Sequence, residues 1–346
     1  MARANRIFIS DIHLSSQTLY QTKLDGHPAA WYDPDAHRTR LLGFLEKHVI
    51  EKAEFIKDLV ILGDLFDNWV CPADQEPPTW EELIDSNSPE IEALQAVVKN
   101  GINIFYIPGN HDYDVADSRV EDAVGGLRLI EAYSGAGRTH AEHGHAYTLF
   151  NSRDFHNDPR CGRPVGYFIA RLAATIPGSA RSFEDLLSYV DDVIDALTNP
   201  TALIEVIVEA LAERAGVDEI VMPGGDAITI EEVKRRYGGL CEQRKVGLFG
   251  LRDRLFGRDY LQTTADQLCK KHGRNVVLFG HTHDAGIRKD KVGHEHRIYA
   301  NTGVWCREKA HCVIIRKPPI KSGVSVVLAE VGADGKIGVG TTEKLD

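Results

Sequence analysis

The sequence predicts an α/β protein built from layered sheets and helices, with a helical insertion in its second half. Short apolar runs recur along the chain, end in Gly, Asp or Asn, and are followed by helical patterns, which is the order of elements in layered α/β folds. The first five runs each end in a small group of acidic, amide or imidazole side chains. Between residues 143 and 281 this strand rhythm is absent, and apolar residues recur at helical spacing instead.

Eight strands are predicted from the apolar runs. They cover residues 6–10, 59–62, 102–107, 138–142, 275–279, 297–301, 312–315 and 325–330. Ligands of open α/β sheets bind beyond the carboxyl ends of the strands. The polar groups that follow the first five strands are therefore expected to form a site.

Helices are predicted between the strands over residues 34–52 and 78–100, and Gly101 suits the end of the second. Three more are predicted in the interval after residue 143. The first has apolar residues at helical spacing from 183 to 197, and the second begins at Asn199 and Pro200 and stops at Gly216. Thr229 and Glu232 form a capping-box pattern before the third. We predict a core of residues 1–151 and 271–346 and a helical cap insertion of residues 152–270, because long excursions from compact domains are usually lids or subdomains.

The composition indicates a globular protein without a dominant basic surface. The chain has 346 residues, 43% of them apolar, and a formal charge of -11, which argues against broad nucleic-acid binding. Its six cysteines include no Cys-x-x-Cys pair, so buried thiols in a reducing cytoplasm are expected. No signal peptide or membrane span is recognised near the N-terminus. The expectation is a soluble, cytoplasmic protein, with peripheral membrane contact and oligomeric state left open.

The first two polar groups supply carboxylates and an imidazole. Asp11 and His13 are two residues apart, so both side chains can lean into one cavity at a strand end; a turn cap and a surface His are the alternative for this pair alone. Asp64 leaves a buried strand at Gly63, where a carboxylate that bridges two cations avoids an unpaired buried charge. A helix N-cap is the alternative for this residue. Asp67 is expected behind the direct ligands.

The third group, Gly109 to Asp112, is more specific. Asn110 offers a neutral carbonyl oxygen to a hard or borderline metal. We expect His111 to face the substrate, with Asp112 fixing its tautomer and favouring the imidazolium. An Asx turn with solvated neighbours explains the same residues only in isolation.

The last two groups are histidine pairs, each separated by one residue: His143 with His145, and His281 with His283. A lone His is more often hydrogen-bonded or exposed than a metal ligand. His143 is the preferred ligand of the first pair because it follows the strand directly. A supporting role, a substrate-side role and no role at all remain open for His145.

Five such groups in order, without cysteine among them, predict a catalytic metal site. Asp, Asn and His ligands suit Mn²⁺, Fe or Zn²⁺ in a site with open positions for water, and not a closed structural zinc site. We expect two divalent cations, with Mn²⁺ as the first choice.

The five groups lie in the segments ISDIH, ILGDLFD, IPGNHD, AEHGH and LFGHTH. They resemble the signature of the calcineurin-like metallophosphoesterase superfamily, and the resemblance covers roughly residues 5–150 and 272–330. It implies a four-layer α/β/β/α sandwich with two metals at one edge. It also implies that one metal is held by Asp11, His13, Asp64 and His283, and the other by Asp64, Asn110, His143 and His281. His111 would then lie beside the leaving group.

The expected reaction is hydrolysis of a phosphodiester, a pyrophosphate or a phosphomonoester. Two cations about 3.5 to 4 Å apart hold a shared water, lower its pKa and neutralise phosphoryl oxygens. A metal-bridging hydroxide beside Asp64 would attack, and His111 would donate a proton or hydrogen bond to the leaving oxygen. A non-catalytic metal-binding scaffold is the competing class, and a nuclease is a third.

The substrate is expected to depend on the insertion. Residues 234–258 carry eight basic and two acidic side chains with apolar residues between them. This pattern fits a lid over a phosphorylated small molecule or lipid-linked substrate, or a membrane contact, and it also fits a helix with a solvated basic face. The segment ILGDLFDNWV and the place of the insertion resemble the UDP-2,3-diacylglucosamine pyrophosphohydrolase branch.

Overall fold

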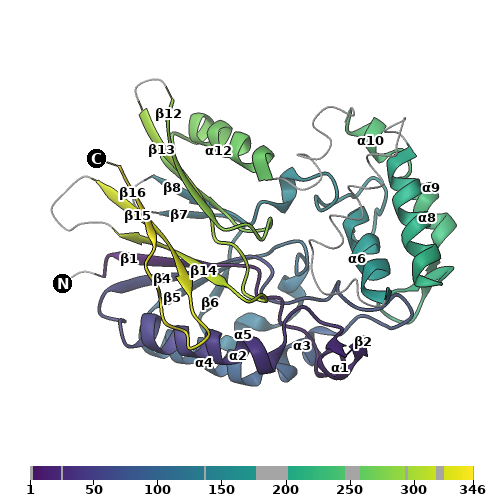
Figure 1. Ribbon diagram of the computed structural model, residues 1–346, viewed down its shortest axis with the longest axis horizontal. Coiled ribbons are helices and arrows are strands. Elements are labelled where there is room, and N and C mark those ends of the chain that lie inside the picture. Colours follow the sequence, from purple (N-terminus) through teal and green to yellow (C-terminus); the bar gives the residue numbers. More distant parts are fainter. Residues whose placement is uncertain are drawn as a thin grey trace.

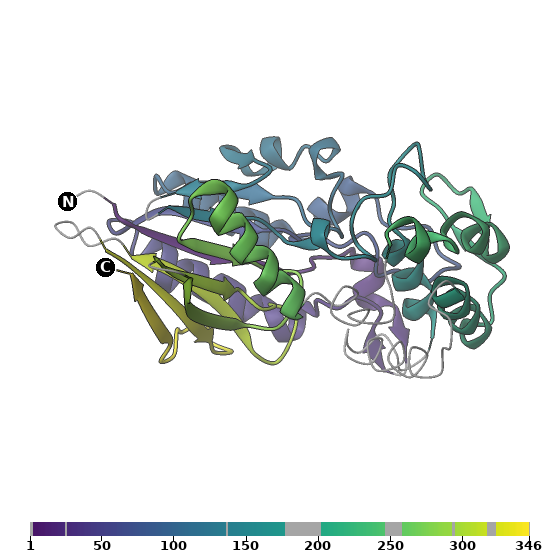
Figure 2. The same ribbon diagram turned by 90° about the horizontal axis from the view of Figure 1, so that it is seen from above.

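The computed structural model describes residues 3–24, 26–135, 138–176, 202–245, 258–292, 295–316 and 323–345. These residues form two β-sheets that pack face to face, with helices on the outer faces and a separate group of helices at one end (Figure 1). The same division is visible from above, where the second group of helices extends beyond the sheets (Figure 2).

The first sheet has seven strands in the order β16-β15-β14-β1-β4-β5-β6. Four of them run parallel: β1 (Asn5–Ile9), β4 (Ile56–Leu62), β5 (Asn103–Ile107) and β6 (Leu127–Leu129). Three antiparallel strands extend the other side: β14 (Ala310–Arg316), β15 (Val324–Val331) and β16 (Thr341–Leu345). Ile9 pairs with Ile61, and Leu62 pairs with Ile107, so the carboxyl ends of three parallel strands meet at one edge.

The second sheet has five strands in the order β12-β13-β11-β8-β7. They are β12 (Gly286–Val292), β13 (Glu295–Asn301), β11 (Val276–Phe279), β8 (Thr139–Ala141) and β7 (Tyr133–Gly135). The inner three, β8, β11 and β13, are parallel. Their carboxyl ends therefore deliver the histidine segments to a common edge.

Three apolar cores separate four layers. Phe8 and Leu62 of the first sheet pack with Leu278 and Ala300 of the second. A larger core lies between the first sheet and helices that include α2 (Pro34–Phe44), a π-helix (Leu45–Ile50) and α4 (Ser88–Lys99). On the other side α12 (Arg258–His272) packs on β11 through Leu261 and Ala265. The predicted four-layer α/β/β/α sandwich is confirmed.

All eight predicted strands are present, and the predicted helices differ from the observed ones in detail. The helix expected over residues 78–100 is divided into α3 (Trp80–Ser86) and α4. The break is at Asn87, whose buried side chain donates to the carbonyl oxygens of Ser15 and Leu83. The contact with Ser15 joins Asn87 to a distant loop, but Pro89 in the first turn of α4 is a local signal of the same break that the predicted single helix did not use. The helix expected over 34–52 is observed as α2 followed directly by the π-helix, which ends at Ile50.

The helices at the far end form a cap with its own apolar core. It contains α6 (Val165–Thr175), α8 (Leu203–Ala215), α9 (Ile230–Tyr237) and α10 (Leu240–Gln243). A two-stranded hairpin, β9 (Glu219–Val221) and β10 (Ala227–Thr229), is added to the expected helices. Gly216 ends α8 at φ +67°, and the Thr229 hydroxyl accepts from the Glu232 amide at the start of α9. Both predicted helix boundaries are confirmed.

The predicted insertion of residues 152–270 agrees only in part with the observed cap. The helix expected over 183–197, the cap at Asn199 and Pro200, and the second half of the basic stretch lie outside the described residues. The boundary at residue 270 is wrong, because it falls inside α12, which packs on the second sheet and not in the cap. An amphipathic helix can pack its apolar face on a sheet or on another helix. The helical period of the sequence therefore does not show whether α12 belongs to the core or to the cap.

Short elements complete the core. They are α1 (Gln17–Gln21), β2 (Lys23–Leu24), β3 (His27–Pro28), a 3₁₀ turn (Val115–Asp117), α5 (Val120–Val124) and a second 3₁₀ turn (His145–Tyr147).

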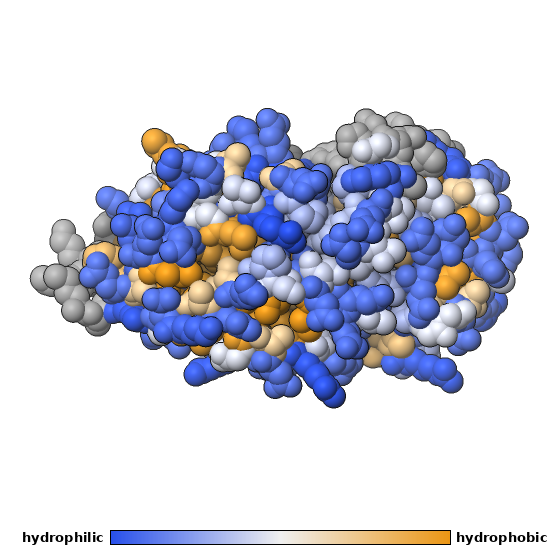
Figure 3. Space-filling model, turned by 90° about the horizontal axis from the view of Figure 1, so that it is seen from below, coloured by the Kyte–Doolittle hydropathy of each residue, from blue (hydrophilic) through white to orange (hydrophobic). Residues whose placement is uncertain are grey.

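The described surface is predominantly hydrophilic. On the face shown in Figure 3, polar and charged residues surround small groups of apolar ones. Among the described residues, Phe55, Phe155 and Val339 are the large apolar side chains that are exposed. Within the same residues, none of the helices has the length and apolar character needed to cross a membrane.

Candidate metal centre

The five polar groups meet where the carboxyl ends of the two sheets adjoin. The backbone amides of Asp11 and His13 donate to the carbonyl oxygens of Gly63 (3.1 Å) and Asp64 (2.9 Å). The amide of His281 donates to the carboxylate of Asp11 at 3.0 Å. These contacts join segments that are far apart in the sequence, so the loops after β1, β4 and β11 form one structure.

The backbone at this edge adopts conformations that L-residues rarely use. Asp11, His13, Asp64, His281 and His283 have φ between +52° and +70°. Such residues cost about 1 to 3 kcal/mol each and persist where the surrounding structure holds them. Only three other non-glycine residues among those described have positive φ. The strain is concentrated at the predicted ligands, where it turns their side chains toward a common point.

Glycines make room for the same side chains. Gly63 has φ +83°, and a Cβ built on it would overlap the imidazole of His143. A Cβ at Gly109 would overlap the carboxylate of Asp64. The glycines in ILGD and IPGN are therefore explained by close approach of site residues, in addition to turn geometry.

Asp64 lies at the centre of the site. It is buried, its Oδ2 is 3.1 Å from Nε2 of His143, and its Oδ1 accepts from the backbone amide of His111 at 2.8 Å. Burial alone would raise the pKa of Asp64, but the neighbouring imidazoles of His143 and His111 hold it well below its usual range. The carboxylate is therefore ionised and faces two sides of the site.

Asp11 forms the adjoining part. Its Oδ1 lies 3.2 Å from Nε2 of His283, and Nε2 of His13 lies 3.2 Å from the same His283 nitrogen. Ser10 donates to the other oxygen of Asp11. Burial opposes ionisation of Asp11, and the nearby His143 and His283 still lower its pKa. One carboxylate oxygen and two ring nitrogens thus converge on one point.

Hydrogen bonds on the outer nitrogens assign which ring nitrogen faces the site. Nδ1 of His143 donates to the carbonyl oxygen of Leu62 at 2.6 Å, and Nδ1 of His13 donates to the carboxylate of Asp67 at 3.0 Å. In both rings Nε2 then faces inward, the nitrogen that a metal-ligating histidine presents. Burial would lower the pKa of His143, but Asp64 and Asp11 raise it to about 10, so a cation bound there would replace the proton on Nε2. Oδ1 of Asn110 lies 3.1 Å from Nε2 of His143, on the same side.

Asp67 supports the inner residues, whereas Asp112 does not have the expected place. Oδ1 of Asp67 accepts from Nδ1 of His111 at 2.9 Å, while its Oδ2 binds His13. Asp112 instead accepts from the amide of Gly109 at 2.6 Å and from the hydroxyl of Tyr106. The expectation that Asp112 orients His111 is wrong. Neighbours in sequence diverge here because the turn directs Asp112 under the loop.

The remaining histidines lie at the margin. His281 contacts the ring of His143 with centroids 5.1 Å apart, and its Nε2 is 3.2 Å from the hydroxyl of Thr148 and 3.4 Å from the amide nitrogen of Asn151. His145 lies beside the same ring at 5.4 Å. Burial, and then the neighbouring His143, lower the pKa of His145 to about 3, so this ring is neutral.

The donor set fits divalent cations. Three overlapping groups each place their ligand atoms within 4.8 Å of one another: Asp11, His13 and His283; His13, Asp64 and His111; and Asp11, Asp64 and His143. Oδ1 of Asp11 accepts no hydrogen bond among the described residues. A buried, ionised carboxylate is stabilised by a charged partner or by a metal. The ring of His283 lies beside this oxygen, and oxygen with imidazole donors suits Mn²⁺, Fe or Zn²⁺.

Two tryptophans that sequence reasoning missed line this site. The ring of Trp31 lies 4.8 Å from that of His13, 5.3 Å from His111 and 5.6 Å from His283. The ring of Trp69 lies 4.7 Å from that of His111. Trp69 is five residues after Asp64 in the sequence, and this closeness could have predicted that it lies near the site. Trp31 comes from an irregular loop, and nothing in the sequence distinguishes it.

Comparisons with known proteins agree with this geometry. Residues 5–171 match the family model described as calcineurin-like phosphoesterase. UDP-2,3-diacylglucosamine hydrolases from strains of Xanthomonas campestris pv. campestris are 31% identical over 124 residues, which is 36% of this chain. The aligned part spans 38% of the length of these relatives.

Solved structures show only a distant likeness. A Vps29 double mutant from Entamoeba histolytica is 9% identical, with 99% of this chain and 98% of that chain covered and a TM-score of 0.36. GAP50 of Plasmodium is 11% identical, with 99% and 89% covered and a TM-score of 0.37. Scores this low have no bearing on function.

Proposed function

We propose that this chain, which belongs to the calcineurin-like phosphoesterase family, hydrolyses phosphate esters with two divalent cations. The proposed ligands are Asp11, His13, Asp64, Asn110, His143, His281 and His283. The observation that carries the proposal is the convergence of two buried carboxylates with inward-facing imidazole nitrogens. A binuclear centre with Asp64 between its two halves accounts for the three overlapping groups better than one cation does.

The side chains would divide the work as follows. The cations, once bound, would supply a hydroxide for attack and neutralise phosphoryl oxygens. Asp64, ionised and central, would hold both halves of the centre together. Asp67 would keep the rings of His13 and His111 in place through its two oxygens.

His111 is the proposed donor to the leaving oxygen. Burial would lower its pKa, but Asp67 and Asp64 raise it above the ordinary value for histidine. The imidazolium is therefore favoured. Its contact with Asp67 through Nδ1 leaves Nε2 as the donor that would serve the substrate. General-acid help of this kind typically contributes about 10²- to 10⁴-fold.

The substrate proposed for testing is a lipid-linked pyrophosphate of the UDP-2,3-diacylglucosamine type. Support comes from the name of the matching relatives and from a cap whose apolar core adjoins the site through Trp69. A cytoplasmic location is part of this proposal, in keeping with six free cysteines. A phosphodiester or a simple phosphomonoester is the alternative substrate.

Substitution of the central carboxylate tests the reaction. Asp64→Asn removes one charge at the centre, so metal content should fall and hydrolysis of an aryl phosphodiester with Mn²⁺ should drop by more than about 100-fold, because changes behind the ligands already cost 10- to 100-fold. Metal content is measured by mass spectrometry. The exposed Asp122→Asn is the control. A scaffold is indicated if the metal-loaded wild-type protein hydrolyses no phosphate ester.

A substrate panel tests the finer assignment. UDP-2,3-diacylglucosamine, simple nucleotide diphosphate sugars, aryl phosphodiesters and phosphomonoesters are compared with Mn²⁺ under one set of conditions. The proposal expects the highest kcat/KM for the acylated pyrophosphate. Activity confined to simple monoesters would remove it and leave the metal-dependent reaction intact.

A further inference from the structure

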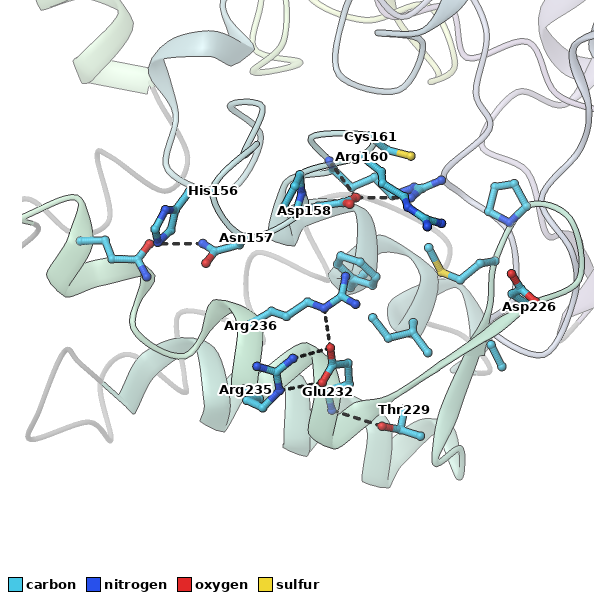
Figure 4. A pocket seen from close by; sticks show the side chains of 18 residues that line it. His156, Asn157, Asp158, Arg160, Cys161, Asp226, Thr229, Glu232, Arg235 and Arg236 are labelled. Atoms are coloured by element: carbon cyan, nitrogen blue, oxygen red, sulfur yellow. Dashed lines mark hydrogen bonds and ion pairs between the residues drawn. The ribbon is translucent and has the colours of Figure 1, made fainter.

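A second hollow of about 1060 Å³ lies in the cap. Its walls come from the loop 156–163, from α6 through Phe168, from the β9–β10 turn, and from α9 and α10 (Figure 4). None of the proposed metal ligands lines it. The hollow is therefore a feature of the cap itself, distinct from the metal centre.

Four arginines line this cap pocket: Arg160, Arg163, Arg235 and Arg236. They share the pocket with three carboxylates, those of Asp158, Asp226 and Glu232. In Figure 4 Asp226 lies away from Arg235 and Arg236, whereas Glu232 lies beside these two arginines and Asp158 lies near Arg160. Four arginines against three carboxylates give the lining a small excess of positive charge, on a chain whose formal charge is -11.

The existing ion pairs leave donors available. Glu232 accepts from Nε of Arg236 at 2.7 Å and from two nitrogens of Arg235 at 2.6 and 2.7 Å. A guanidinium has five N–H groups in a fixed fork. Among the described contacts Arg236 uses only Nε. Its two terminal nitrogens can therefore donate to a bound anion, and the fork matches the oxygens of a phosphate.

The walls of the cap pocket are held in place before any ligand binds. The amides of Asp158 and Gly162 donate to the carbonyl oxygens of Asp154 and Asp158 at 2.9 and 2.8 Å. The hydroxyl of Tyr237 on α9 donates to the carbonyl oxygen of Arg163 at 2.7 Å, which joins the loop to the helix. Arg163 also donates to the Asp158 carboxylate at 3.3 Å. A prearranged pocket loses less conformational entropy on binding.

Part of the lining of the cap pocket is apolar. Phe168 and Ile228 are buried in the cap core, and the half-buried Met222 lies beside them. The volume is at the upper end of ordinary small-molecule sites, which span about 300 to 1,000 Å³. It accommodates an organic body attached to an anion.

We propose that the cap pocket is a second ligand site, which binds a phosphomonoester with an uncharged organic body. Arg236 and Arg160 bind the phosphate, and the apolar side formed by Met222 and Ile228 contacts the organic part. The site does not depend on the reaction at the metal centre.

Calorimetric titration with adenosine 5′-monophosphate tests this proposal. In the Mn²⁺-loaded wild-type protein the nucleotide is expected at the cap pocket and at the metal centre, where hydrolysis would add its own heat, so affinities for the cap pocket are taken from Asp64→Asn. Asp64→Asn should remove the second class of sites and keep the first. Arg236→Gln and Arg160→Gln should each weaken the remaining class by about tenfold or more, the effect of one charge-assisted hydrogen bond. Both arginines are partly or fully exposed, so folding should be kept.

Lys234→Gln is the matched control. Lys234 is on α9, pairs with Glu231 and Glu209, and does not line the pocket. Its substitution should leave nucleotide affinity unchanged. Equal weakening by Lys234→Gln and Arg236→Gln would reduce the effect to general charge and overturn the proposal.

Ligand variants decide which chemistry is recognised. Adenosine lacks the phosphate and should bind at least tenfold more weakly than its monophosphate. Inorganic phosphate lacks the organic body and should also bind more weakly. The proposal is overturned if adenosine or inorganic phosphate binds as tightly as adenosine 5′-monophosphate. It is also overturned if neither Asp64→Asn nor the wild-type protein shows saturable binding of the nucleotide. A failed metal centre would instead show as loss of metal with cap binding retained.

Discussion

The metal centre and the cap pocket both gather charged side chains from distant parts of the chain, but at different depths. Asp11, His13 and Asp64 are buried and lie on strained turns at strand ends. Arg235 and Arg236 lie on a helix surface, partly exposed and paired with Glu232. Buried charge requires a partner of fixed position, whereas exposed charge is screened by water. The charges of the metal centre are therefore fixed by burial, whereas those of the cap pocket lie on a prearranged wall that water still reaches.

The largest expected effect comes from filling space at the sheet edge. In Gly109→Ala the new methyl group overlaps the carboxylate of Asp64, so either that side chain or the loop must move. A displacement of about 1 Å can cost 10²-fold in rate. We expect phosphodiester hydrolysis to fall by at least that factor and metal content to decrease.

Gly286→Ala is the control for this substitution, because no heavy atom lies within 4 Å of its Cβ position. It should retain metal and activity. If Gly109→Ala kept a full metal complement and normal turnover, the close packing of Gly109 against Asp64 would not matter for catalysis. The metal centre would then be no more sensitive to packing than the cap pocket.

The attachment of the cap to the core should have the next largest effect. Arg171 of α6 is fully buried and donates to the carbonyl oxygens of Cys71 (2.8 Å), Pro72 (2.9 Å), Gln75 (2.5 Å) and Val221 (2.9 Å). Arg171→Met leaves these acceptors unsatisfied. We expect the free energy of unfolding in urea to decrease by about 3 to 5 kcal/mol.

Exposed Arg244→Met provides the comparison for Arg171→Met and should change the same free energy by less than about 0.5 kcal/mol. Equal effects would mean that the buried hydrogen bonds of Arg171 do not hold the cap. The metal-dependent activity of both variants, measured far from the unfolding transition, separates loss of stability from loss of the site.

Asp67 and Asp112 have different contacts: Asp67 binds two imidazoles of the site, and Asp112 binds the loop beneath it. Asp67→Asn has one carbonyl oxygen for the imidazoles of His13 and His111, so one contact is lost. Hydrolysis should fall by about 10- to 100-fold. Asp112→Asn should have a smaller effect, because Asp112 contacts neither ring. Equal losses of kcat in the two variants would contradict this assignment.

The smallest expected effect is on the pH dependence of the free energy of unfolding, through His37 in the core. Burial, and then Arg40, lower the pKa of His37 to about 4, and its Nδ1 accepts from the amide of Asp33 at 2.9 Å. The folded state therefore binds fewer protons at this group than the unfolded state between pH 6.5 and 4. Stability from His37 is complete above pH 6.5 and is lost as the pH falls toward 4.

Urea unfolding at pH 7 and pH 5 measures this difference. His37→Asn should reduce the loss of unfolding free energy between the two values by an amount on the order of 1 kcal/mol. The exposed His296→Asn should not. An unchanged pH dependence in His37→Asn would show that this ring does not contribute.

Much of the fold was predictable because strand patterns are local. All eight predicted strands lie where apolar runs indicate them. The packing of α12 was not predictable, since it depends on a contact with a distant segment. The division of a helix at Asn87 had a local signal in Pro89, at the start of α4. The short β6 and β7, three residues each, also lack enough sequence for a period to appear.

The roles of Asp67 and Asp112 show the same limit within the site. Both carboxylates stand in motif segments and both were expected behind the ligands. Only Asp67 reaches the imidazoles, while Asp112 turns under its loop toward Gly109 and Tyr106. The direction of a side chain at a tight turn depends on backbone angles that the residue type does not specify.

The sequence by itself determined the positions of eight strands along the chain and the chemical groups at the ends of five of them, because apolar period and residue type are local properties. The family resemblance of those groups followed from the same information. Tertiary structure decided which groups face each other, which carboxylate supports which ring, and that Trp31 lies beside three site imidazoles. It also decided that four arginines of the cap surround one pocket. The physical reason is that such contacts arise from packing between segments distant in the chain.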